Sequence, residues 1–305
     1  MFLRIEPARL IEMVTSVVHP TESLSRSVFE RPAVRGGARL RYEWCPLTEQ
    51  TRLVQQWVRP PLYINKAYHE KGWALSQMMS PTGGLLQDDV LEIDVELGAG
   101  ARAALISPAA CRVHSMQASH AQIRQRFRVG AGAIFDLWPA PLILQAGARL
   151  QQQTRVDLAP SARVLLCELV SPGRVAFGEA FRFDAWRSNL EIRREGALLV
   201  YENFSAQPSQ GDLADWQALF PGGLYASLYY LSPDPMEAVI DDLNGLSDRA
   251  CYVGASPLRK GGIGVKLIAE DGSALRRGIT QLRSLILPAQ DELPHALKRA
   301  QTFFY

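Results

Sequence analysis

The chain of 305 residues lacks the features that define several large protein classes. No apolar run approaches the roughly 20 residues that a membrane-spanning helix requires. Charged residues interrupt the first dozen positions, so the apolar core of a secretory signal peptide is missing there. The 33 Lys and Arg nearly balance the 31 Asp and Glu, without a basic run, which gives no reason to expect nucleic acid or a membrane as a partner. We therefore expect a cytoplasmic globular protein.

The sequence also lacks the signatures of common catalytic and metal sites. Its four cysteines are far apart and form no C-x-x-C pair, which is typical of reduced thiols in the cytosol. Phosphate-loop, zinc-protease and nucleophile-elbow motifs are missing. Cys111 and His114 come nearest to a metal pair, but a spacing of three places them on opposite faces of a strand. A buried thiol is the favoured interpretation of Cys111, and we expect no tightly bound cofactor.

Short strand-forming runs, punctuated by Gly and Pro, make up most of the chain. They predict an all-β dominated fold with a small C-terminal α/β portion. We expect three parts: an N-terminal extension over 1–36, a β-helical body over 37–232, and an α/β portion over 233–305 packed on that body. Within the last part the pattern predicts helices over 234–243 and 274–287 and strands over 250–255 and 263–269.

An internal repeat supports the β-helical body. Residues 95–105, 127–137 and 156–166 each contain an alternating strand, a turn of small residues, an Ala and a second apolar strand. The copies start 32 and 29 residues apart. A period near 30 is typical of stacked β coils, in which each unit buries its apolar face against the next. Three ordinary hairpins with similar turns are the alternative.

The segment 80–94 joins a tight turn to a strand. Gly83 and Gly84 permit the positive φ angles of such a turn and let another backbone approach closely. The neighbouring carboxylates Asp88 and Asp89 point in opposite directions if they enter a strand, so only one of them faces a given surface.

Acidic residues also interrupt apolar segments further along the chain. Glu168 lies in the apolar run 164–170, where a carboxylate must be paired, hydrated in a channel or shifted in pKa. Arg174 and Glu179 flank Gly178, and Arg174 can pair with either Glu179 or Glu168 as a structural ion pair. Glu202, in the segment 198–204, has the same two interpretations.

Four landmarks occur in order along residues 38–205: Ser80–Asp89, the Leu97–Ala101 turn with Ser107–Arg112, Phe135–Pro141, and Pro172–Phe181 with its Pro-Gly-Arg…Gly-Glu…Phe pattern. Together they resemble the urease accessory proteins of the UreD (also UreH) family. The resemblance implies an all-β body of helical topology without catalytic activity. It further implies a scaffold that binds apo-urease on one side and a UreF-like protein, carrying the UreG-like GTPase, on the other.

Nickel released by the GTPase is implied to pass through the scaffold to urease. The family's path positions correspond here to Asp89, Cys111, Glu168 and, with a shift of one residue, Glu202. Weak oxygen and sulfur donors along a path suit a metal in transit, because a closed site with four ligands would trap it. The resemblance assigns the landmark residues Gly83, Gly84, Arg174, Gly178 and Glu179 to structure.

The sequence departs from the family pattern in places. Asp88 stands where the family usually has Gly, and Arg112, His114 and Ser115 replace the usual Lys, Tyr and Arg. A divergent β-solenoid binding protein without a urease role therefore remains an alternative. An enzyme using Glu168 and Glu179 as an acid/base pair is a more distant one, because it needs both carboxylates in one cleft.

Overall fold

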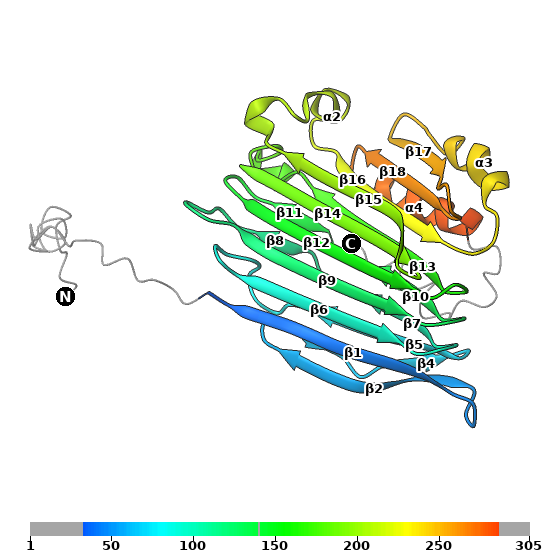
Figure 1. Cartoon of the computed structure of the whole chain (residues 1–305). Coiled ribbons are helices and arrows are strands. Elements are labelled where there is room, and N and C mark those ends of the chain that lie inside the picture. Colours follow the sequence, from blue (N-terminus) through cyan, green and yellow to red (C-terminus); the bar gives the residue numbers. More distant parts are fainter. Residues whose placement is uncertain (1–32, 140, 287–305) are drawn as a thin grey trace, which may run out of the picture. The chain divides into compact units, whose positions relative to one another are not determined.

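The computed structural model describes residues 33–139 and 141–286. These residues form two large β-sheets joined by short turns, with helices near the C-terminal end of the described chain (Figure 1). The all-β dominated fold with a stacked β body and a C-terminal α/β portion is confirmed. The predicted 1–36 extension lies almost wholly outside the described residues, although β1 begins at Arg35.

The first sheet has seven strands in the order β15-β14-β12-β9-β6-β1-β2. Their bounds are β1 (Arg35–Cys45), β2 (Gln50–Arg59), β6 (Val90–Leu97), β9 (Ala121–Val129), β12 (Arg149–Leu158), β14 (Ala185–Arg194) and β15 (Ala197–Ala206). The strands from β1 to β14 are parallel, whereas the two edge strands run antiparallel to their neighbours.

The second sheet has eleven strands, with β17-β18-β16-β13-β10-β7-β5-β3 as its main order. Their bounds are β3 (Tyr63–Ile64), β4 (Tyr68–Glu70), β5 (Trp73–Met79), β7 (Arg102–Ile106), β8 (Cys111–Val113), β10 (Ile134–Trp138), β11 (Leu142–Leu144), β13 (Arg163–Ser171), β16 (Leu224–Leu231), β17 (Cys251–Pro257) and β18 (Ile263–Ala269). The helices are η1 (Val175–Phe177), η2 (Pro208–Gln210), α2 (Ala214–Leu219), η3 (Glu237–Val239), α3 (Ile240–Asn244) and α4 (Gly272–Ile286).

The repeat copies stack in parallel register, as predicted. Phe127 pairs with Val95 on one side and with Val156 on the other, so equivalent positions of the three copies form one row of the first sheet. The second strands of the copies, β7, β10 and β13, are likewise parallel neighbours in the second sheet. Backbone hydrogen bonds also join the turns, with the Gly130 amide donating to the Leu97 carbonyl and the Ala159 amide to the Val129 carbonyl. The matched register of the copies thus lets each coil bury its apolar face on the next.

Two separate cores hold this body together. The larger lies between the sheets, where inward side chains of both sheets meet, among them Val95, Phe127 and Phe135. The smaller lies on the other face of the second sheet, where α4 packs against residues of several strands, β17 and β18 among them. Because β13 contributes Leu166 to the first core and Leu165 to the second, the strand is buried on both faces, which explains its continuous apolar run.

The C-terminal portion extends the second sheet and covers its outer face. Strands β17 and β18 and helix α4 agree with the predicted elements, although Leu287 lies outside the described residues. The predicted helix over 234–243 is wrong at its start, because regular structure begins only with η3 and α3. The Asp234 carboxylate accepts hydrogen bonds from Arg163 at 2.8 Å and from Ser232 at 3.0 Å, so it does not cap a helix.

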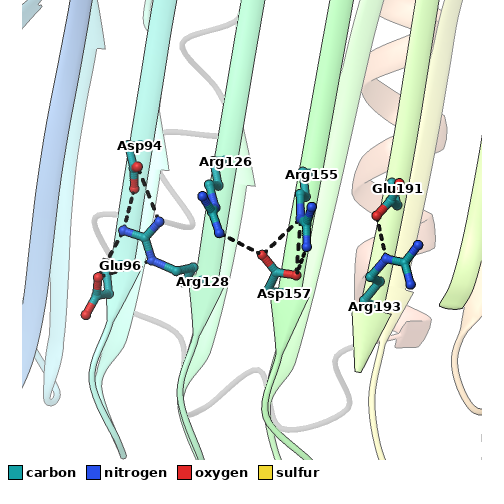
Figure 2. A network of polar contacts seen from close by, with 8 residues as sticks. All are labelled: Asp94, Glu96, Arg126, Arg128, Arg155, Asp157, Glu191 and Arg193. Carbon is teal, nitrogen blue, oxygen red and sulfur yellow. Dashed lines mark hydrogen bonds and ion pairs between the residues drawn. The ribbon is translucent and has the colours of Figure 1, made fainter. Parts of the chain in front are cut away.

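The outer face of the first sheet carries a ladder of charges (Figure 2). In one row across the strands, Arg41, Glu96, Arg128, Asp157 and Arg193 alternate in sign. The Arg128 guanidinium donates to Asp94 at 2.8 Å and to Glu96 at 3.0 Å, and Figure 2 shows the equivalent contacts of its neighbours. Opposite charges on neighbouring strands are a stabilising cross-strand arrangement.

Candidate functional site

A cavity of about 110 Å³ lies between the two sheets. Apolar side chains of both sheets line much of its wall, and polar groups enter it from Gln125, Gln152 and Glu168. At one end it is bordered by Ser80, Thr82, Gly84, Ser107, Ala109, Ala110 and Cys111. Its volume is sufficient for several water molecules.

A second, smaller cavity of about 40 Å³ adjoins the first. Gln125, Gln152 and Glu168 line both, so the two cavities meet at these side chains. The smaller one continues to Ser188, Glu202, Ser227 and Tyr229. A row of polar groups therefore runs through the interior from Cys111 to Glu202, with Glu168 in the middle.

Glu168 is the central acid of this row. It lies on β13 and is partly buried, and its carboxylate accepts a hydrogen bond from the Ser188 hydroxyl at 3.3 Å. Burial, followed by the nearby Glu202 carboxylate, raises the pKa of Glu168 to about 7. Near neutral pH the group can therefore either hold a proton or offer a carboxylate to a cation.

Glu202 lies on the edge strand β15 and contacts two side chains of the second sheet, Lys266 and Tyr229. Its two oxygens accept hydrogen bonds from the Lys266 ammonium at 2.7 and 2.6 Å. The Tyr229 hydroxyl donates to the same carboxylate, and burial together with this hydrogen bond raises the pKa of Tyr229. Lys266 also donates to the Ser227 hydroxyl at 2.7 Å. The predicted ion pair at Glu202 therefore exists, within the lining of the smaller cavity.

Cys111 lies at the other end of the row, on the short strand β8. Burial raises the pKa of its thiol to about 11, so the group is protonated at neutral pH and is a weak ligand. His114, which the sequence offered as the nearest candidate for a metal pair with Cys111, faces the Pro-Thr-Gly-Gly turn, with its Nε2 2.8 Å from the Gly83 carbonyl oxygen. The structure therefore does not join Cys111 and His114 into a metal pair.

Asp89 immediately precedes β6. Its carboxylate is buried, but it accepts hydrogen bonds from the backbone amides of Val34 at 3.0 Å and Leu86 at 2.9 Å, and it lines neither cavity. It thus fastens the start of β1 to the turn before β6. Asp88 beside it has a φ of 66°, in the left-handed region that favours glycine and that Asp tolerates.

The Gly83–Gly84 turn packs directly against β8. A side chain at Gly84 would lie 2.2 Å from the Arg112 carbonyl oxygen, and the residue has a φ of 129°. The Leu85 amide donates to that same carbonyl at 2.8 Å, and Leu85 lies next to Val113 in an isolated bridge. The turn therefore positions the backbone at the Cys111 end of the cavity.

The Pro172–Phe181 loop is closed by an ion pair between Arg174 and Glu179, with the Arg174 Nε 2.8 Å from Glu179. Gly178 ends η1 in the left-handed conformation, with a φ of 69°. Of the two partners that the sequence allowed for Arg174, the structure selects Glu179. Glu179 lines neither cavity, so it does not meet Glu168 there.

Several polar residues of the site were not predicted: Gln125, Gln152, Ser188, Ser227, Tyr229 and Lys266. A signal for two of them exists in the repeat. In the stacked register Gln152 lies beside Ile123, and Gln125 lies beside Ile93, so both occupy inward positions that alternation otherwise fills with apolar residues. The Oε1 atom of Gln152 is buried and has no hydrogen-bond partner among the described residues.

Within residues 33–139 and 141–286, no three His, Cys, Asp or Glu side chains are placed to hold a metal ion together. The polar side chains of the row lie singly or in pairs along the cavities, and apolar side chains lie among them in the cavity walls. In the same described ranges, no helix is both long and apolar enough to cross a membrane.

The sequence profile of the family described as UreD urease accessory protein matches residues 34–301. The chain therefore belongs to the UreD family of urease accessory proteins. The resemblance inferred from the four landmarks is thus confirmed, and family membership implies a role in urease maturation.

Individual relatives cover most of the chain. The urease accessory protein UreD of Opitutus terrae is 33% identical over 248 residues, which are 78% of this chain and 89% of that protein. The protein of the same name from Natronomonas pharaonis is 32% identical over 210 residues, 68% of this chain and 67% of that protein. The one from Haloarcula marismortui is 27% identical over 270 residues, 85% and 90% of the two chains.

Proposed function

We propose that this member of the UreD family is a non-catalytic scaffold through which nickel reaches apo-urease in the cytoplasm. In this proposal it binds apo-urease on one side and a UreF-like protein on the other, and the UreF-like protein carries the UreG-like GTPase that releases nickel. The family's role in urease maturation supports the general setting.

The observation that carries the proposal is the continuous row of polar groups inside the body. Cys111, Gln125, Gln152, Glu168 and Glu202 succeed one another along two adjoining cavities. Polar groups are costly between packed sheets unless they are satisfied or serve a purpose. Here Gln125, Glu168 and Glu202 have hydrogen-bond partners outside the row, and each also borders one or both cavities.

The chemistry of the donors suits an ion in transit. Carboxylate, amide and thiol groups all bind divalent first-row metals, and one or two donors at a time bind weakly enough to release the ion. Cys111 is protonated near neutral pH, and Glu168 has a pKa of about 7, so both must give up a proton to hold the ion. Asp89 is left out of this path because backbone amides occupy its carboxylate.

An acid/base enzyme has less support from the geometry. Glu179 is held by Arg174 on the η1 loop, outside the cavities that contain Glu168. The two carboxylates therefore do not flank one bond of a bound substrate, which such a mechanism requires.

The proposal is tested by replacing the central acid. Glu168→Gln keeps the shape of the side chain and removes the carboxylate, and Glu168→Lys reverses its charge. Each variant is produced with urease and the other accessory proteins, and the nickel content of purified urease is measured by mass spectrometry. We expect several-fold less nickel with Gln and still less with Lys, while the accessory complex still co-purifies.

Glu237→Gln is the matched control, since it removes an exposed carboxylate on η3 that is outside the cavities. Urease matured with this variant should hold its full complement of nickel. Fully loaded urease from both Glu168 variants would refute the nickel path. Loss of complex assembly would instead assign Glu168 to structure.

A further inference from the structure

Lys266 places a positive charge where the row of polar groups ends. Its ammonium contacts both oxygens of Glu202, at 2.7 and 2.6 Å, and the Ser227 hydroxyl at 2.7 Å. It also lies over the Tyr229 ring, 4.9 Å from the ring centre. Its neighbours thus provide a complete cation site: a carboxylate, a hydroxyl oxygen and an aromatic face.

The position of Lys266 follows from the register of the second sheet. Glu168 on β13 pairs with Ser227 on β16, and Ser227 pairs with Lys266 on β18, so the three form one row across the strands. The flanking residues Val265 and Leu267 belong to the second core on the outer face. Strand alternation therefore turns Lys266 inward, toward the space between the sheets.

We propose that the Lys266 ammonium is the resident cation of Glu202 and that a metal ion reaching this end of the cavity must displace it. This inference rests on the proposed function, since it assigns a gate to the same path. A divalent ion and the Lys266 ammonium compete for the Glu202 carboxylate, because the ammonium contacts both of its oxygens and two like charges at such separation repel each other in a partly desolvated site. Lys266 thus keeps Glu202 from retaining the ion.

Partial exposure makes this exchange feasible. The Lys266 side chain is 37% exposed and that of Glu202 is 28% exposed, so solvent reaches the pair. A displaced ammonium on a flexible stem can move into water and return after the ion has left. By contrast, the Arg283–Asp136 pair is buried to within a few per cent and has no such exit.

The test measures nickel binding by the purified full-length protein. Lys266→Met keeps the apolar stem and removes the charge, and Lys266→Gln keeps a hydrogen-bond donor as well. Calorimetric titration with nickel chloride should give about tenfold tighter binding for both variants than for the wild type, as expected for removal of one directly coupled charge. Adding Glu202→Gln to either variant should abolish the tighter nickel binding, because that binding depends on the Glu202 carboxylate.

Two controls separate this gate from a general effect of charge or folding. Lys266→Arg keeps the positive charge and should bind nickel as weakly as the wild type. Lys260→Met removes a charge from the exposed β17–β18 loop and should also leave nickel binding unchanged. Thermal denaturation verifies that each variant is folded before titration, and either neutral variant suffices if the other fails to fold.

Unchanged nickel affinity in a folded neutral variant would overturn the inference and leave the pair as a structural link between the sheets. The two proposals can also fail separately. Tighter nickel binding by Lys266→Met, combined with fully loaded urease from the Glu168 variants, would support the resident cation and refute the path. Nickel-poor urease from the Glu168 variants, combined with unchanged nickel affinity of the Lys266 variants, would support the path and refute the resident cation.

Discussion

The two sheets differ in where they can place charged side chains. The outward residues of strand β12 in the first sheet are polar, and its inward residues are apolar except for Gln152 and Thr154. Its partner in the same coil, β13, contributes apolar residues to the cores on both faces. The first sheet can therefore carry a ladder of charges on its open face (Figure 2). Any charge in the second sheet must instead find a partner or a cavity.

Two acids of the second sheet meet this requirement differently. Asp136 on β10 is 3% exposed and pairs with the guanidinium of Arg283 on α4, which also lies over the Trp138 ring. Glu168 on β13 has a serine hydroxyl as its hydrogen-bond donor and a cavity beside it. The comparison indicates that Asp136 serves the attachment of α4, whereas Glu168 borders open space between the sheets.

The largest effect is expected from breaking the buried pair. Asp136→Ala leaves the Arg283 guanidinium buried without its counter-charge, and removal of one partner of such a pair costs about 3–5 kcal/mol. We expect this loss in the free energy of unfolding, measured by urea denaturation. Because Arg283 joins α4 to β10, the backbone amides of α4 should also show a larger increase in hydrogen-exchange rate than those of the rest of the body.

The double variant Asp136→Ala with Arg283→Met is the control for the charge itself. With both charges removed, no uncompensated ion remains, so the double variant should be more stable than Asp136→Ala alone. Equal stability of the single and double variants would mean that the cost comes from lost packing rather than from the orphaned guanidinium.

An intermediate and pH-dependent effect is expected at Glu168. Its pKa is raised from the ordinary 4.5 to about 7, so the folded protein holds a proton that the unfolded chain has released over this range. The stability linked to this proton is complete below pH 4.5 and is lost as the pH rises to about 7. Glu168→Gln stays neutral, so its advantage over the wild type should grow across this window to an order of 1–3 kcal/mol.

Chemical denaturation at about pH 5 and about pH 8 measures this difference, and comparing variant with wild type at each pH removes the contribution of all other groups. An equal advantage at both values would show that the Glu168 carboxylate is ionised throughout and already solvated in its cavity. That outcome would weaken the contrast between the two sheets.

The fold could be predicted from the sequence because the repeat is local. Each copy contains the pattern of a strand, a turn and a second strand within about ten residues, and copies with the same pattern stack in register. The start of the predicted helix at 234 could not be recognised in this way. Asp234 is engaged by Arg163, which is 71 residues earlier in the chain, and no local pattern contains that contact.

The site was predictable only in part, for the same reason. Glu168 stood out because an acid interrupts an apolar strand, but Asp89 had equal prominence and is occupied by the Val34 and Leu86 amides. Lys266 carried no signal, since a single lysine in a strand is usually a solvated side chain. Its proposed role depends on a contact with Glu202 across 64 residues and between two sheets.

The smallest effect is expected on the open face of the first sheet. Arg128 is the best-connected arginine of the ladder, with contacts to Asp94 and Glu96, yet about a third of its side chain is exposed. Water and salt screen such pairs, so Arg128→Ala should cost only about 0.5–1 kcal/mol in urea denaturation at low salt. Most of this loss should vanish at about 1 M sodium chloride, where the screening length is roughly 3 Å.

Arg187→Ala is the matched control. Like Arg128, Arg187 lies on the outer face of the first sheet, on strand β14, but it has no ion pair within the described residues. Its removal should change stability little at either salt concentration. A loss at Arg128 that persists in high salt would contradict the expected screening. The ladder would then act as a rigid, partly desolvated network like the Arg283–Asp136 pair. In that case the two sheets would differ in how many charges they carry, and not in how those charges contribute to stability.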